Sequence, residues 1–141
     1  MAGTAWGHVS PVSFPTPILY VALEADRAAR LTLPAVLAAE RAVYAVTGTL
    51  EIDGQAVDET QMAVLASGED VSLALPAGAK AVICGGAPLD SPRKMDWNFV
   101  SSDPDKIAAA RADWARAVES GGTDQFPLVP GDETDWIPLP D

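Results

Sequence analysis

Few side chains in this sequence could do acid–base or nucleophilic chemistry. It has one histidine, His8, and one cysteine, Cys84. A single imidazole leaves no second histidine to serve as a base, and no Ser-His-Asp set can be built around His8 in its proline-rich arm. Cys84 lies in an apolar run, which favours a buried small hydrophobic side chain over a nucleophile. We therefore predict no catalytic residues.

Glycines and carboxylates are the next candidates. Gly85-Gly86 follows a predicted strand but opens no helix, so it is not a phosphate-binding loop. Asp and Glu number 20 against 9 Lys plus Arg, which gives a formal net charge of −11. They gather in turns and in the acidic stretch after Arg116, where water solvates them. This charge balance argues against nucleic-acid binding, because phosphate contacts need clustered cations.

Short β-type runs separated by turn residues must position these side chains. We expect strands at 18–23, 29–33, 42–46, 49–52, 62–65, 71–75 and 80–84. Asp53-Gly54 predicts a two-residue hairpin turn, because both residues tolerate positive φ. Strands at this spacing indicate an all-β sandwich or barrel. Prolines forbid a helix in residues 1–17, so we expect an extended lead-in arm there.

One helix is expected, over residues 104–118. Asp103 is a suitable N-cap, and Pro104 follows at the first helical position. Trp114 falls on the apolar face of this helix, where it either packs in the core or forms a platform for a ligand.

The last stretch, residues 126–141, contains four prolines and is expected to be extended. We predict that it packs over the barrel, with Phe126, Trp136 and Ile137 as apolar anchors.

Several stretches resemble the pirin family. Residues 40–54 are similar to the first conserved segment of a cupin barrel, and residues 62–73 to the second. The run Trp-Asn-Phe-Val-Ser-Ser at 97–102 and the closing residues 126–140 are similar to the C-terminal signature of pirins. The resemblance implies an all-β cupin (RmlC-like jelly-roll) barrel, in which residues 18–141 form one domain equivalent to the C-terminal barrel of a pirin.

Pirins have two barrels in one chain, and their metal, usually iron, lies in the N-terminal barrel. The family's activities include flavonol dioxygenation and, in animals, transcriptional co-regulation. Because this chain resembles the C-terminal barrel, the resemblance implies no metal and no cofactor here.

The metal-ligand positions of the cupin motifs agree with this implication. An active cupin holds its metal with roughly three His and one Glu. In this sequence the equivalent positions are occupied by Arg41 at the Glu, by Ala35 and Leu37 (or Pro34 and Val36) at two His, and by Val71 at the third. None of these side chains binds a metal, and a guanidinium would repel one.

Arg41 and Tyr44 remain as candidate ligand-binding residues. Both lie in residues 40–54, the segment similar to the first conserved segment of a cupin barrel. Arg41 either meets an anionic ligand inside the barrel mouth or forms an ion pair with a carboxylate, for which Glu40, Glu24 and Asp96 are candidates. Tyr44 either offers its hydroxyl to a ligand or packs in the core.

Three functional hypotheses follow. The first is a non-catalytic, metal-free cupin that acts by association, with itself as a homodimer or with a partner cupin barrel. The second is a cupin that binds an unidentified small molecule, and the third is an enzyme of the dioxygenase or isomerase type. No apolar run reaches the roughly 18 residues of a membrane span, and Met1–Ser10 lacks the pattern of a signal peptide. We therefore expect a cytoplasmic protein without membrane partners.

Overall fold

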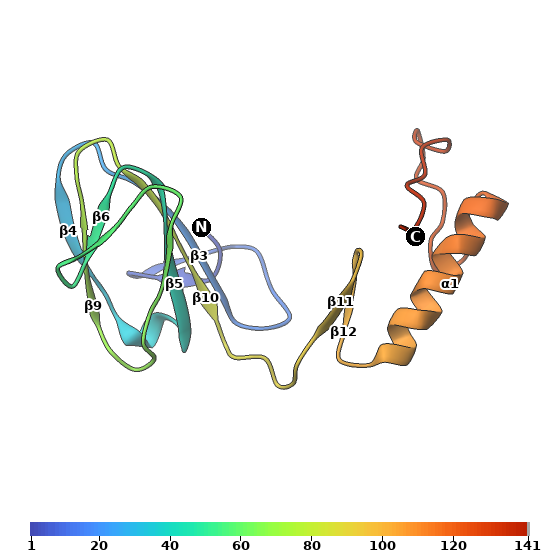
Figure 1. The fold of residues 1–141 in the computed structure, drawn as a ribbon, viewed down its shortest axis with the longest axis horizontal. Helices are drawn as coiled ribbons and strands as arrows, with labels where there is room; N and C mark the ends of the chain where they lie inside the picture. Colours follow the sequence, from blue (N-terminus) through green and yellow to red (C-terminus); the bar gives the residue numbers. More distant parts are fainter. Residues whose placement is uncertain (141) are drawn as a thin grey trace. The chain divides into compact units, whose positions relative to one another are not determined.

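The computed structural model describes residues 1–140. The chain divides into two compact units, Met1–Pro88 and Leu89–Asp141 (Figure 1). The first unit contains the strands, and the second contains a short hairpin, the helix and the C-terminal segment. The expectation of one domain over residues 18–141 stays a prediction.

The first unit is built from ten strands and one 3-10 turn. They are β1 (Thr4–Ala5), β2 (His8–Val9), β3 (Ile18–Glu24), β4 (Ala29–Leu33), η1 (Ala35–Leu37), β5 (Glu40–Thr47), β6 (Leu50–Ile52), β7 (Gln55–Val57), β8 (Met62–Val64), β9 (Val71–Leu75) and β10 (Lys80–Gly86).

Eight of these strands form two antiparallel four-stranded sheets, with the orders β3-β10-β5-β8 and β4-β9-β6-β7. Figure 1 shows the two sheets facing one another. Most successive strands cross from one sheet to the other, as in a jelly roll. The predicted all-β architecture is therefore confirmed.

The core lies between the two sheets because side chains alternate along each strand. In β9, Val71, Leu73 and Leu75 are buried while the residues between them are half-buried on the outer face. The largest fully buried side chains of the unit are Leu19, Leu33, Val43, Leu50, Leu73 and Ile83. Each fully buried side chain of this size contributes on the order of 1.5–3 kcal/mol to folding.

Two hairpins have the same kind of turn. Asp53 and Gly54 have φ of 47° and 82° and connect β6 to β7, which confirms the predicted hairpin. Trp6 and Gly7 have φ of 46° and 79° and connect β1 to β2. The extended arm predicted over residues 1–17 is therefore partly wrong, because its first part folds back and buries Ala5 in the core.

The second unit contains β11 (Lys94–Asp96), β12 (Phe99–Ser101) and α1 (Pro104–Ser120). The side chain of Asp103 accepts a hydrogen bond from the Asp105 amide at 2.9 Å, and Gly121, with φ of 73°, ends the helix. The predicted helix is confirmed and is two residues longer than expected at its C-terminal end. Within residues 1–140, no helix is both long and apolar enough to cross a lipid bilayer.

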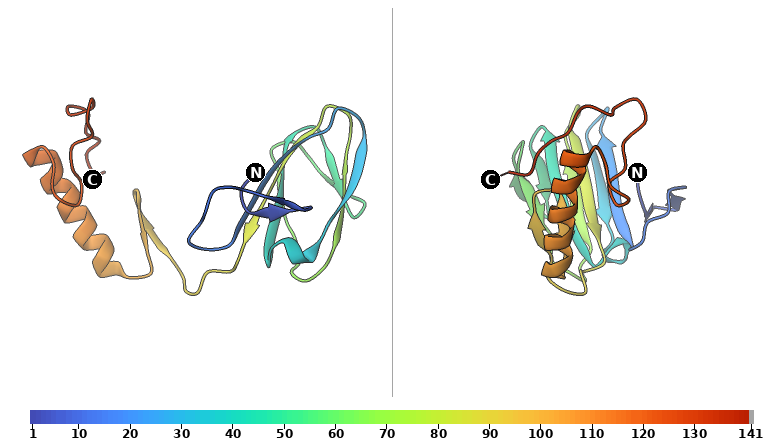
Figure 2. Two further views of the ribbon diagram at one scale, coloured as in Figure 1. Left: turned by 180° about the vertical axis from the view of Figure 1, so that it is seen from behind. Right: turned by 90° about the vertical axis from the view of Figure 1, so that its right-hand side faces the viewer.

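An aromatic cluster holds the C-terminal segment against α1. Trp114 of the helix has its ring centroid 5.3 Å from those of Phe126, Trp97 and Trp136. Its indole Nε1 also donates to the carbonyl of Ile137 at 2.9 Å. Figure 2 shows this segment running beside the helix. Phe126 and Trp136 thus pack against α1, whereas the Ile137 side chain is 68% exposed. That the segment packs over the barrel stays a prediction.

Candidate functional site

The positions that resemble a cupin metal site converge at one end of the first unit. Arg41 is the second residue of β5, Val71 begins β9, and Ala35 begins η1. The Asp70 carboxylate, next to Val71, accepts a hydrogen bond from the Ala35 amide at 2.8 Å. The fold therefore brings together the positions that the sequence motifs single out.

Arg41 fills this place with a buried guanidinium, because its side chain points inward with those of Val43 and Ala45. Arg41 is 2% exposed and donates to three backbone carbonyls: to Leu33 at 3.0 Å, to Ala66 at 3.1 Å and to Glu69 at 2.5 Å. Its Nε–H finds no acceptor among the described residues. The planar guanidinium thus ties the last residue of β4 to the loop between β8 and β9.

The predicted ion pair of Arg41 is wrong. Within residues 1–140, Arg41 has no carboxylate partner; Glu24 pairs with Lys80 and Asp96 pairs with Arg111. Carbonyl dipoles take the place of a counter-charge, because the loop backbone comes closer to the guanidinium than any acidic side chain. A ligand-binding role for Arg41 stays a prediction.

These residues do not fit a transition metal. The motif positions hold the Arg41 guanidinium, which is always charged, and aliphatic side chains, and none of these can ligate a metal ion. The nearby Asp70 carboxylate already accepts a hydrogen bond from a backbone amide. Over residues 1–140 as a whole, no three His, Cys, Asp or Glu side chains are grouped so that they could hold a metal ion.

We expect the purified protein to carry less than about 0.1 iron, nickel, manganese or zinc per chain, because a bound divalent ion needs three or more donors and would meet the Arg41 charge. Elemental analysis after gentle purification and dialysis checks this expectation. About one metal ion per chain retained through dialysis would contradict it.

Tyr44 lies on the other face of β5 from Arg41. Because side chains alternate along a strand, Tyr44 points out of the sandwich, where it is half-buried. The alternative of core packing is therefore wrong, and the two candidate residues do not line one interior site.

Tyr44 belongs to an outer surface that we call the apolar face. Strand register aligns its side chains in two rows across β3, β10, β5 and β8: Ala22, Val82, Tyr44 and Met62 in one, and Tyr20, Cys84, Ala42 and Val64 in the other. Paired residues of neighbouring antiparallel strands project to the same side of the sheet. Cys84 is half-buried on this face, so its predicted place in the core is wrong.

The apolar face is well exposed on both edge strands of the sheet, β3 and β8, and an ion pair lies beside it. Val64 is 82% exposed, Met62 54% and Tyr20 48%. The row next to Ala22 holds the ion pair of Lys80 with Glu24, whose atoms are 3.5 Å apart. An apolar centre with a charged rim is the usual composition of a protein–protein interface.

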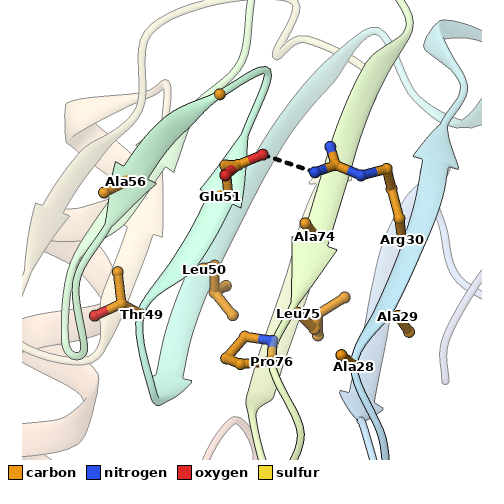
Figure 3. A pocket seen from close by; sticks show the side chains of 11 residues that line it. Ala28, Ala29, Arg30, Thr49, Leu50, Glu51, Ala56, Ala74, Leu75 and Pro76 are labelled. Atoms are coloured by element: carbon orange, nitrogen blue, oxygen red, sulfur yellow. Dashed lines mark hydrogen bonds and ion pairs between the residues drawn. The ribbon is translucent and has the colours of Figure 1, made fainter.

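A shallow groove of about 590 Å³ crosses the outer face of the other sheet (Figure 3). Arg30 and Glu51 form an ion pair of 2.8 Å there, because both are paired in register with Ala74, which lies between them. Arg30 also donates to the Ser72 hydroxyl at 3.0 Å. The charged side chains of the groove thus form hydrogen bonds with one another, and none of them is a base beside a nucleophile. Sequence reasoning missed this pair because only the strand register joins residues so far apart.

Gly85 and Gly86 are the last residues of β10, where they pair with the start of β5 and form no phosphate loop. A Cβ at Gly85 would lie 2.1 Å from the carbonyl oxygen of Glu40 on the neighbouring strand. The glycine therefore permits close approach of β10 to the start of β5, beside Arg41.

Asp90, which lies in an exposed loop, has a perturbed pKa. The hydrogen bond from Arg93, together with the charge of that guanidinium, lowers the pKa of Asp90. The guanidinium Nη2 of Arg93 and the carboxylate Oδ1 of Asp90 are 2.5 Å apart. A surface ion pair accounts for this lowered pKa without any catalytic role.

The class of protein follows from structural comparison. A crystal structure of quercetin 2,3-dioxygenase from Acinetobacter baumannii matches 99% of this chain and 46% of its own, with a TM-score of 0.84 and 24% sequence identity. A second structure of an A. baumannii quercetin 2,3-dioxygenase matches 82% of this chain and 41% of its own, with a TM-score of 0.69 and 20% identity. At these identities the comparison shows the fold alone, and that fold is the predicted cupin barrel.

The family follows from sequence comparison. The family model of the pirin C-terminal cupin domain matches residues 20–119, so this chain belongs to the pirin family through that domain. A pirin-like protein of Caulobacter vibrioides is 38% identical over 141 residues, which are 100% of this chain and 46% of the relative. A putative quercetin 2,3-dioxygenase of Pseudomonas aeruginosa is 31% identical over 115 residues, 81% of this chain and 36% of that protein. The chain thus spans less than half the length of these relatives.

Proposed function

We propose that this pirin-family cupin acts without metal and without catalysis, by association through its apolar face. The occupant of that face is a second copy of the chain or a separate cupin barrel. The observation that carries the proposal is the pair of apolar rows across four strands, which end in the exposed side chains of Met62 and Val64. The filled motif site around Arg41 supports the non-catalytic part.

The energetics favour covering this face. Each Å² of apolar surface removed from water contributes about 25 cal/mol, and a stable interface buries roughly 800 Å² per partner. The two rows would supply the centre of such an interface, and the neighbouring charged residues its rim. The net charge of −11 opposes self-association, but salt screens this repulsion beyond roughly 8 Å at physiological ionic strength.

We expect light scattering at micromolar concentration to give about twice the 14.7 kDa of one chain. Val64→Lys should shift this mass toward the monomer, because a lysine would have to be desolvated within the apolar interface. Val36→Lys is the matched control. Val36 is 89% exposed but lies on η1, away from the apolar face, so its substitution should leave the mass unchanged.

A wild-type mass of one chain would contradict the homodimer and leave only a separate cupin barrel as occupant. A dimer that survives Val64→Lys would contradict the assignment of the interface to the apolar face.

The dioxygenase hypothesis is the second candidate. Its support is the similarity to the P. aeruginosa relative, a putative quercetin 2,3-dioxygenase. A metal-dependent reaction would need ligands that the Arg41 site does not supply, so the association proposal is preferred.

We further propose a cytoplasmic location. The single cysteine, Cys84, is free, so the fold has no need of an oxidising compartment.

A further inference from the structure

The second unit contains an apolar pocket of about 490 Å³ between α1 and the C-terminal segment. Its walls include the rings of Trp114, Phe126 and Trp136, together with proline and aliphatic side chains of the segment. The volume is in the range of sites that hold small molecules. The pocket lies far in sequence from the apolar face, and it has no part in the proposed association.

The aromatic rings of the lining residues are inclined to one another and do not stack face to face. The ring of Trp114 is inclined by 84° to that of Phe126 and by 60° to that of Trp136, with centroids 5.3 Å apart in both pairs. The face of an aromatic ring carries negative charge density and attracts a cation held within about 6 Å of its centroid.

Two carboxylates also line the pocket, from Asp132 and Asp135. Neither forms an ion pair within residues 1–140, whereas nearby acidic groups are engaged: Glu133 accepts from the Gly131 amide at 2.9 Å, and Asp113 pairs with Arg116. No lysine or arginine lines the pocket, and none follows Arg116 in the sequence. The charge of this pocket is therefore negative and uncompensated.

We propose that this pocket binds the alkylated ammonium group of a small organic cation. Aromatic faces and apolar walls suit the methyl groups of such a cation, and Asp132 and Asp135 match its charge. A simple metal ion would gain nothing from the apolar walls, and an anion would be repelled by both carboxylates.

The test titrates the full chain with choline and, separately, with its neutral carbon analogue 3,3-dimethyl-1-butanol. Binding is followed by the NMR signals of the four indole N–H groups, one for each tryptophan. We expect choline to shift the signals of Trp114 and Trp136 and to leave that of Trp6 in place. The neutral analogue should bind about tenfold more weakly, as expected for the loss of a partly desolvated cation–π contact.

Matched charge variants locate the site. Asp132→Asn with Asp135→Asn should weaken choline binding about tenfold. The control, Asp124→Asn with Glu133→Gln, removes the same two charges from exposed residues that do not line the pocket, and it should change binding less than about twofold. The indole spectra of both variants without choline report whether the aromatic cluster is intact, and Asp135→Asn alone replaces the double variant if that spectrum changes.

Three results would overturn the proposal: equal binding of choline and its neutral analogue, equal loss of binding in the lining and control variants, or no shift of the Trp114 and Trp136 signals. A lysine-rich peptide that shifts these signals when choline does not would assign the pocket to a protein partner instead, and would likewise overturn it.

Discussion

Replacing Arg41 with alanine should lower the free energy of unfolding by about 3–5 kcal/mol. The substitution takes the donors from a buried carbonyl, on Leu33, and from two partly buried ones, on Ala66 and Glu69. A buried acceptor left without a partner costs about 1–3 kcal/mol, and truncating the buried Arg41 side chain leaves a cavity that adds to the loss. Part of this cost is recovered as water enters the site. Urea unfolding followed by circular dichroism measures the change.

Two controls separate the role of the guanidinium from that of side-chain bulk and surface charge. Arg41→Lys keeps the charge but not the planar fork, and it should recover only part of the lost stability. Arg30→Ala removes an exposed ion pair with Glu51 and should cost less than about 1 kcal/mol. An Arg41→Ala protein within about 1 kcal/mol of wild type would show that the guanidinium does not hold the end of β4 to the loop between β8 and β9.

Replacing Trp114 with alanine should destabilise the second unit by about 3–5 kcal/mol, the usual cost of truncating a packed large aromatic side chain. Trp114 contacts the rings of Trp97, Phe126 and Trp136, and its Nε1–H anchors the Ile137 carbonyl. The indole NMR signals of Trp97 and Trp136 should broaden or disappear at a lower urea concentration than in wild type.

Ile137→Ala is the matched control for Trp114. The Ile137 side chain is exposed, and only its backbone carbonyl is used, so this substitution should change the stability by less than about 0.5 kcal/mol. Equal losses from Ile137→Ala and Trp114→Ala would contradict the arrangement of the aromatic cluster.

Elements with strong local signals could be predicted from the sequence. The strands β4 and β9 have the expected bounds, because apolar residues alternate with polar residues in β4 and with small residues in β9. The turn at Asp53-Gly54 and the caps of α1 were equally clear. The hairpin of β11 and β12 was missed because its turn begins at Trp97, which has φ of 50°, and a bulky residue in this region gives no turn signal.

The orientation of the side chains on β5 could not be predicted. Arg41, Val43 and Ala45 face the core, while Tyr44 lies among apolar residues on the outer face. Because both faces of this strand are mostly apolar, alternation does not say which face is inside. For the same reason the sequence predicts that Cys84 lies in the core. The outer face of this sheet is apolar too, and it is the surface that we propose for association.

The partners of Arg41 could not be predicted either. A cation in a sequence predicts a carboxylate as its partner, whereas backbone carbonyls have no sequence signal of their own. Their meeting at Arg41 depends on two loop conformations that only the folded chain defines.

Oxygen uptake with quercetin is the most direct test of a metal-free, non-catalytic cupin. The protein is incubated with Fe²⁺ without air and desalted, and oxygen consumption is then recorded after quercetin is added. We expect a rate of oxygen consumption equal to that of buffer treated in the same way, because the residues around Arg41 retain no iron. Quercetin-dependent oxygen uptake that rises in proportion to the protein, with about one iron per chain, would contradict it.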